Sequence, residues 1–156
     1  MTGVVADASP LIAFAQIGQL PLLQALFTRL LVPPSVAQEI APSVPRQSWI
    51  VERRLAQPIP PLILEARLGT GETEAISLAL ELHADQLVVD EKAGRHLATD
   101  LGLNVIGTLG ILLAAKGKSL IPAVRPQIEA LLENNFWIRP ELVERTLAQV
   151  GEKAKP

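Results

Sequence analysis

The amino-acid sequence predicts a three-layer α/β fold in which a parallel sheet of four or five strands is flanked by helices. Short apolar runs of strand length alternate with segments of helical periodicity through most of the chain. Two of these runs end in an acidic residue, Asp7 and Asp90, and ligands of open parallel sheets bind at that edge. The length of 156 residues fits one core, so we expect residues 1–156 to form a single domain.

Four segments have the apolar character of buried strands. They are residues 3–7, 30–32, 86–90 and 104–106. A fifth segment, residues 43–61, contains four prolines and is irregular, and it could contain a short strand or a mobile flap. The predicted number of strands therefore depends on this segment.

Helical periodicity is strongest after the break at residues 69–71, where Ala75, Leu78 and Ala79 share one face of a helix that runs to about residue 83. Ser9 is the predicted N-cap of the first helix, with Pro10 at the first helical position. The other predicted helices cover residues 10–17, 21–27, 35–41, 91–101, 108–116, 124–134 and 139–150.

The composition excludes several kinds of site. The absence of cysteine excludes disulfides, thiol catalysis and cysteine-built zinc sites. His83 and His96 are too far apart to form a ligand pair on one helix face. Any metal must therefore be a hard cation, such as Mg²⁺ or Mn²⁺, held by oxygen ligands.

Charge and aromatic content argue against a broad nucleic-acid-binding surface. The net charge is −2 and aromatic residues make up only 3% of the chain. Many single-strand binders combine a basic surface with several stacking aromatics, which this composition does not predict. A cation held by acidic residues can still supply the positive charge that a phosphate backbone needs.

The N-terminal segment and the distribution of apolar residues predict where the protein is located and whether it forms an oligomer. The N-terminal segment has no basic start and carries Asp7 where a signal peptide would be apolar, and the run 105–115 is too short to span a bilayer. We therefore expect a cytoplasmic protein. The apolar surplus, 49% of residues, predicts a homodimer that buries Phe136 and Trp137, unless both aromatics close the core of the monomer.

Acidic residues at the strand ends form the candidate site. Asp7 and Asp90 would face the same edge of the sheet, where two close carboxylates repel each other and a cation between them is the simplest stabiliser. Either residue could instead cap the helix that follows it. For Asp7 this alternative is weaker, because Ser9 already fits that role.

Three glutamates complete the set of candidates. Glu72 and Glu74 lie in the first turn of their helix, where the helix dipole favours any acid. Glu74 borders the apolar face, so we expect Glu74 to point inward and Glu72 to be solvated. Glu39 lies on a short helix one turn after the second strand, where a glutamate is usually solvated.

With these residues in place, the chain resembles a PIN domain, and more closely the DUF3368-type PIN-like branch related to the VapC toxins. The resembling segments are VVADASPLIAFAQIGQL, LLVPPSVAQEI, LGTGETEAISLALELHADQLVVDEKAGRHLATDLGLNVIGTLGILLAAKGKSLI and NNFWIRPELVERTLAQVGE. They cover most of the chain, and residues 43–61 are the weak part. Many VapC-type toxins carry Thr-x-Asp after the later strand, whereas this chain has Asp90-Glu91.

The resemblance implies a Mg²⁺- or Mn²⁺-dependent endoribonuclease, a toxin whose activity a small antitoxin protein inhibits. The catalytic metal ligands that it implies are Asp7, Glu39, Glu74 and Asp90, with Ser9 in support and Glu91 as the alternative to Asp90. Strand alternation lets only one of these two neighbours point straight inward, and we expect Asp90, which directly ends the apolar run.

Two other functions stay open from the residues alone. The first is a catalytically inactive PIN-like module that binds protein or RNA, which the negative charge and scarce aromatics favour. The second is a receiver-like phosphoacceptor at Asp7, although that class needs an acid pair after the first strand. Lys92 and Arg95 could contact phosphate, but a solvated helix face is the preferred interpretation.

Overall fold

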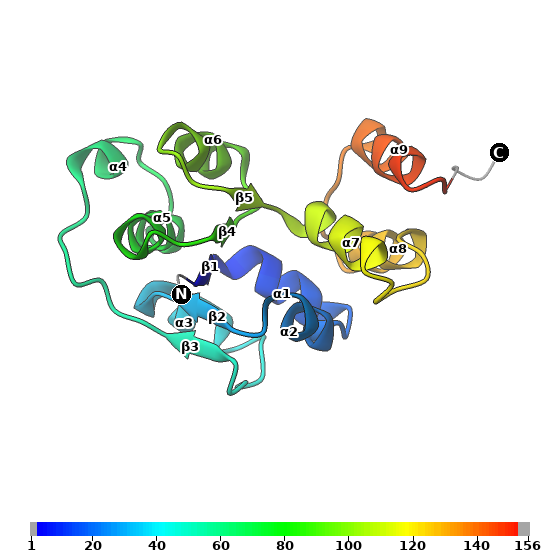
Figure 1. The fold of residues 1–156 in the computed structure, drawn as a ribbon, viewed down its shortest axis with the longest axis horizontal. Coiled ribbons are helices and arrows are strands. Elements are labelled where there is room, and N and C mark those ends of the chain that lie inside the picture. Colours follow the sequence, from blue (N-terminus) through cyan, green and yellow to red (C-terminus); the bar gives the residue numbers. More distant parts are fainter. Residues whose placement is uncertain (1–2, 153–156) are drawn as a thin grey trace.

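A computed structural model describes residues 3–152 of the chain. Five strands form one parallel sheet in the order β3-β2-β1-β4-β5 (Figure 1). The strands are β1 (Val4–Ala6), β2 (Leu30–Val32), β3 (Ile50–Glu52), β4 (Gln86–Val88) and β5 (Val105–Ile106). The predicted α/β fold with a parallel sheet is confirmed, and the irregular segment 43–61 supplies the fifth strand.

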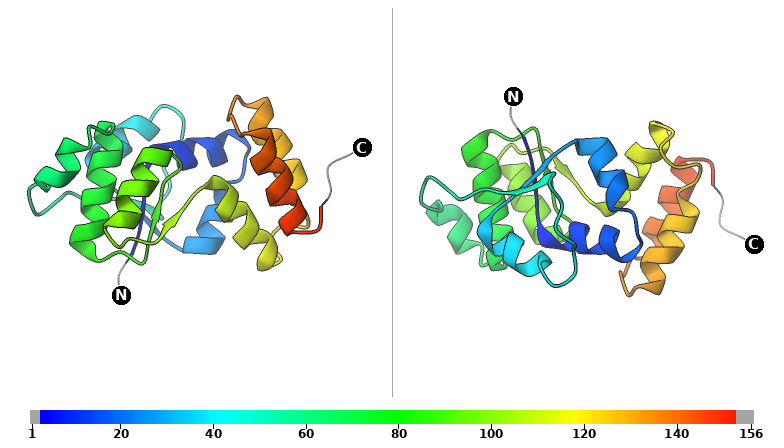
Figure 2. Two further views of the ribbon diagram at one scale, coloured as in Figure 1. Left: turned by 90° about the horizontal axis from the view of Figure 1, so that it is seen from above. Right: turned by 90° about the horizontal axis from the view of Figure 1, so that it is seen from below.

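Helices cover both sides of this sheet. In the described residues they are α1 (Ala8–Gln16), α2 (Leu20–Phe27), α3 (Pro34–Ile40), α4 (Pro61–Glu65), α5 (Thr70–Leu82), α6 (Lys92–Asp100), α7 (Thr108–Gly117), α8 (Arg125–Glu133) and α9 (Pro140–Gln149). Helix α5 packs against β1 and β4 from one side, and α1 and α2 lie on the other (Figure 1). Helices α8 and α9 lie together at the end of the molecule opposite to α4 (Figure 2).

Strand β1 lies at the centre of the sheet and sets the position of the candidate site. Val5 pairs with Leu31 of β2 and with Leu87 of β4, and it is fully buried. A strand covered on both faces reads as a continuous apolar run, as residues 4–6 do. The Asp7 amide donates a hydrogen bond to the Val88 carbonyl oxygen at 2.9 Å, which places Asp7 directly at the carboxyl edge of the sheet.

The start of α1 differs from the prediction. The helix begins at Ala8, and Asp7 occupies the N-cap position with an extended backbone (φ −83°, ψ 169°) and no capping hydrogen bond from its side chain. The predicted N-cap, Ser9, lies inside the first turn, so that assignment is wrong. The chain passes from the β1 ladder straight into the helix, which leaves no room for a separate capping residue after Asp7.

Helix α4 was not predicted, because five residues are too few to show a helical period. Within the described part of the chain, no helix has the length and apolar character needed to cross a membrane.

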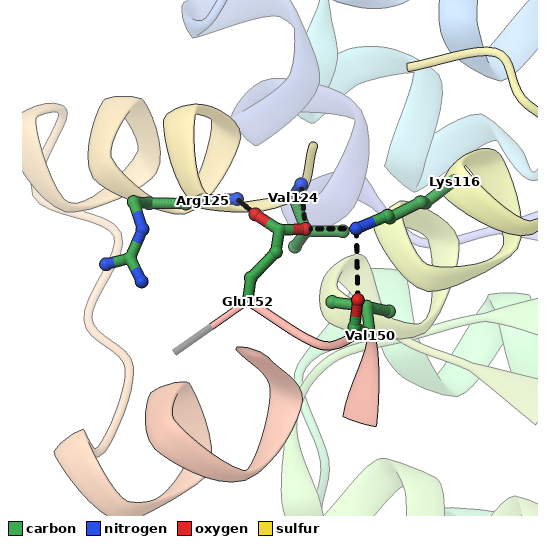
Figure 3. A network of polar contacts seen from close by, with 5 residues as sticks. All are labelled: Lys116, Val124, Arg125, Val150 and Glu152. Atoms are coloured by element: carbon green, nitrogen blue, oxygen red, sulfur yellow. Dashed lines mark hydrogen bonds and ion pairs between the residues drawn. The ribbon is translucent and has the colours of Figure 1, made fainter. Parts of the chain in front are cut away.

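The last described residues are held by a network around Glu152 (Figure 3). The Glu152 carboxylate accepts hydrogen bonds from Lys116 Nζ at 2.7 Å, the Val124 amide at 2.8 Å and the Arg125 amide at 3.0 Å. Lys116 Nζ also donates to the Val150 carbonyl oxygen at 3.1 Å. Glu152 therefore joins the end of α7 to the start of α8.

We expect Glu152→Gln to lower the free energy of unfolding by about 1–3 kcal/mol near neutral pH. Burial raises the pKa of Glu152, but hydrogen bonds from Lys116, Val124 and Arg125 and the Lys116 charge outweigh it and lower the pKa from 4.5 to about 2. A carboxyl group whose pKa is lower in the folded protein stabilises it above the unfolded pKa. This contribution is lost as the pH falls from 4.5 towards about 2.

Urea unfolding at neutral pH and near the lower pKa measures this dependence. The exposed Glu144 of α9 provides the matched control, Glu144→Gln, which should leave stability unchanged. The interpretation fails if Glu152→Gln is as stable as the wild type at neutral pH, or if the same difference persists in acid.

Candidate active site

Asp7 is the buried centre of a group of acidic residues at the carboxyl edge of the sheet. Its side chain is only 7% exposed. Burial, and after it repulsion from Glu39, Asp90 and Glu91, raise its pKa from 3.8 to about 6, although a hydrogen bond from the Ala8 amide lowers it. Asp7 therefore lies within electrostatic reach of three acids that come from α3 and from the segment between β4 and α6.

Glu72, in the first turn of α5, is the second buried acid. It is 9% exposed, and its Oε2 atom is buried without a hydrogen-bond partner. Its pKa is raised from 4.5 to about 7, and burial is the largest cause. A hydrogen bond with Glu91 and repulsion from Glu91 and Asp7 also raise the pKa, whereas a hydrogen bond from the Gly69 backbone lowers it. The expectation that Glu72 is a solvated acid is therefore wrong.

Two glycines make room for these carboxylates. A Cβ atom at Gly71 would collide with Glu39 Oε1 and lie 3.4 Å from Asp7 Oδ1. A Cβ atom at Gly94 of α6 would lie 2.5 Å from Glu72 Oε2. Because neither glycine has a side chain, Glu39 of α3 can lie close to Asp7, and Glu72 of α5 can lie against α6.

Glu74 is bound to α3 and is not among the acids that raise the pKa of Asp7 or Glu72. Its carboxylate accepts hydrogen bonds from the Ser35 amide at 3.0 Å and the Ser35 hydroxyl at 2.6 Å, in the first turn of α3. Glu74 thus ties α5 to the helix that carries Glu39. The expectation that Glu74 is the inward acid of its turn does not match this geometry.

Asp90 and Glu91 also differ from each other. Asp90 accepts hydrogen bonds from the amide and the hydroxyl of Thr108, both at 2.7 Å, at the start of α7. Burial raises the pKa of Asp90, while Thr108 and Arg95 lower it. Glu91, at the N-cap of α6, is the neighbour of Glu72. Strand β4 ends at Val88, so strand alternation does not decide which of the two acids faces Asp7.

Glu39, Asp90 and Glu91 line two cavities, whereas the buried Asp7 and Glu72 line neither of them. Ser9 and Glu39 line the smaller one, of about 450 Å³. Asp90 and Glu91 line the larger one, of about 1060 Å³. Phe136 lines both, so the two cavities adjoin at that residue.

The structure thus brings Glu39, Asp90 and Glu91 into the surroundings of Asp7 and adds Glu72. Asp90 and Glu74 are in addition held by hydrogen bonds to neighbouring helices. Across residues 3–152, no group of three acidic or histidine side chains is already arranged to hold a metal ion. The donors that are present are all carboxylate oxygens, and one of them is buried and unpaired. This donor set fits a hard divalent cation.

Comparison with known proteins identifies the family. A family model described as a PIN domain (DUF3368) matches residues 3–152. Among solved structures, the fold is similar to that of a PilT N-terminus domain protein from the hyperthermophilic archaeon Sulfolobus solfataricus P2. That match has a TM-score of 0.54 and 23% sequence identity, over 72% of this chain and 92% of the other. No curated protein matches the chain. The chain belongs to the PIN-domain family, whose members are typically nucleases and generally use divalent metals.

Proposed function

We propose that this protein is a metal-dependent endoribonuclease that hydrolyses RNA phosphodiester bonds. The observation that carries the proposal is the burial of Asp7 and Glu72 in one acidic group, with raised pKa values and an unpaired carboxylate oxygen. Buried like charges without partners destabilise a folded protein, and such perturbed groups are typical of functional sites. A bound cation would remove this destabilisation.

Asp7 and Glu72 would hold Mg²⁺ or Mn²⁺ from the buried side, and Glu39 and Glu91 from the exposed side. When bound, a divalent cation supplies positive charge next to a phosphate and lowers the pKa of a water molecule. The remaining ligands would be water, as is usual for Mg²⁺. Glu74 and Asp90, predicted from the sequence as ligands, are proposed to act as positioning residues for α3 and α7.

The direct test is cleavage of single-stranded RNA by the purified protein in Mg²⁺ or Mn²⁺. We expect cleavage with either ion, its loss on addition of EDTA and its recovery with excess metal. Mn²⁺ binding, followed by electron paramagnetic resonance, supplies a second readout that does not depend on the RNA chosen. Absence of both cleavage and Mn²⁺ binding would reject the proposal.

An inactive PIN-like binding module is the second candidate. The observation that favours it is the absence, within residues 3–152, of three side chains arranged to hold a metal. This module would bind RNA or protein without cutting RNA. It becomes the better proposal if the protein binds RNA but does not cut it in the presence of any divalent metal.

The same proposal includes a toxin role, inhibition by a small antitoxin protein, and assembly of the chain into a homodimer. The toxin role rests on the family relationship, which is a weaker basis than the site chemistry.

Leu62 and Leu64 on α4 are 57% and 55% exposed, and apolar surface of this kind is commonly covered by a partner. Phe136 packs against the core, but Trp137 is 76% exposed, so the two aromatics do not both close the monomer core.

For the dimer we expect light scattering to give twice the chain mass at micromolar concentration. Leu62→Ser together with Leu64→Ser should shift that mass towards the monomer if α4 lies in the interface. A monomeric mass for the wild type would reject the dimer and leave the nuclease proposal unaffected.

A further inference from the structure

The larger cavity extends well beyond the acidic group. We call it the α6–α9 groove, because its walls come from these two helices, which lie on the same side of β5 and α7 (Figure 1). Its lining includes the apolar residues Ile106, Leu109 and Leu113 and the acids Asp90 and Glu91. The groove therefore combines an apolar surface with two of the acids that lie near Asp7.

One face of α6 forms the first wall. Lys92, Arg95, His96 and Thr99 all line the groove, and their spacing of three and four residues places them on a single helix face. This face is exposed and has an excess of positive charge. From the sequence alone it is indistinguishable from an ordinary solvated face.

One face of α9 forms the opposite wall with the same spacing. It contains Leu142, Arg145, Thr146 and Gln149, and Arg139 lies at the N-cap of the helix. The two arginines make no ion pair with another described residue. They are therefore available to a ligand in the groove.

The charge of the groove is opposite to that of the chain. Four cationic side chains and two acids line it, whereas the whole chain has a net charge of −2. A positive channel beside a group of carboxylates suits an extended polyanion that must reach a metal site.

Trp137 adds an aromatic surface to this channel. It lines the groove and is 76% exposed, whereas the other tryptophan, Trp49, is 7% exposed. The residues on either side anchor the backbone, because Ile138 is buried and Phe136 packs against the core. An indole ring held at the edge of a positive groove is placed to stack on a planar group.

We propose that the α6–α9 groove binds a single-stranded polynucleotide, with Arg139 and Arg145 on its phosphates and Trp137 stacked on an unpaired base. Bases inside a duplex are stacked on one another and offer no free face, so the proposal specifies single strands. It rests on the proposed nuclease function and deepens it by assigning the surface and the residues that would hold the strand beside the acidic group. Its test can be made without cleavage, so the two can fail separately.

The test is binding of a dye-labelled single-stranded oligoadenylate of about ten nucleotides in EDTA, with the affinity of every variant taken from the fluorescence anisotropy of the label and the contact with Trp137 followed by tryptophan fluorescence. Because Trp49 is buried, we expect the quenching on binding to come from Trp137 and to vanish in Trp137→Phe. Trp137→Ala should weaken binding about tenfold, and Trp137→Phe should recover part of that loss. A duplex of the same length should bind more weakly than the single strand.

The arginines are tested through the salt dependence of the same binding. Arg139→Ala and Arg145→Ala should each reduce the slope of log K against log salt by about 0.7, the value for one phosphate contact on a single strand. Arg46→Ala is the matched control, because Arg46 is exposed and lines neither cavity. The control should leave both affinity and slope unchanged.

Wild-type affinity in both Trp137→Ala and Arg145→Ala would overturn the groove proposal, even if the protein cuts RNA. Equal affinity for the duplex would also overturn it. If the emission of Trp137 instead changes with protein concentration alone, and Trp137→Ala is monomeric where the wild type is dimeric, the surface is an interface between two copies and the proposal fails. Trp137-dependent binding by a protein that neither cuts RNA nor binds Mn²⁺ would support the groove and reject the nuclease.

Discussion

Asp7→Asn is expected to reduce RNA cleavage by at least about a hundredfold, because it weakens the central metal ligand. The amide keeps the shape of the side chain but removes one negative charge. The metal-free variant should be at least as stable as the wild type. The reason is that Asp7 is 7% exposed and lies near three other acids, so its charge opposes folding when no cation is bound.

Two measurements separate loss of chemistry from loss of folding. Cleavage of single-stranded RNA is compared with thermal unfolding in EDTA, for Asp7→Asn and for the control Asp100→Asn, whose side chain is exposed at the end of α6. We expect Asp7→Asn to be inactive with an equal or higher Tm, and Asp100→Asn to resemble the wild type. Unchanged cleavage by Asp7→Asn would place the activity at another site or in a contaminant. A lower Tm in EDTA would mean that Asp7 has a structural role.

Four of the five strands were predicted from their apolar residues. Residues 4–6 and 30–32 are continuous apolar runs, residues 87–88 and 105–106 are shorter ones, and the structure contains a strand at each. The strand Ile50–Glu52 is short, partly exposed and followed by a proline-rich stretch, so its composition gives little signal. It is defined by pairing with β2, which is a contact distant in sequence.

The acids after strand ends could also be read from the sequence, but the choice between neighbours could not. In α5, the residues from Gly71 to Ala79 are buried with the single exception of Glu74. A helix that is buried almost all round has no clear polar face, so the rule that placed Glu74 inward does not apply to it. Two glycines accompany the burial of Glu72 in the sequence: Gly71, directly before it, and the distant Gly94. Only the structure explains why these two positions carry no side chain.

The α6–α9 groove was not visible in the sequence for a different reason. Its cations come from two helices separated by α7 and α8, and each helix alone looks like an ordinary solvated face. The low overall charge and the few aromatics argued against a nucleic-acid surface. Totals over the chain hide a local concentration of charge, and one well-placed tryptophan contributes little to an aromatic percentage.

The pair Glu72→Gln and Glu74→Gln distinguishes the two acids of the first turn of α5. We expect Glu72→Gln to lower Mn²⁺ affinity and RNA cleavage about a hundredfold or more, since it removes a buried ligand. The same variant should not destabilise the metal-free protein, because the lost charge has a raised pKa and an oxygen atom without a partner.

Glu74→Gln should show the opposite pattern. It weakens the charge-assisted hydrogen bonds from the amide and hydroxyl of Ser35, so the free energy of unfolding should fall by about 1–2 kcal/mol. Mn²⁺ affinity should stay close to that of the wild type, with a small loss of cleavage from movement of α3. Urea unfolding in EDTA and Mn²⁺ titration of both variants give the comparison directly. If Glu74→Gln loses the metal and Glu72→Gln retains it, the assignment made from the sequence is the correct one, and the acidic group must rearrange when the cation binds.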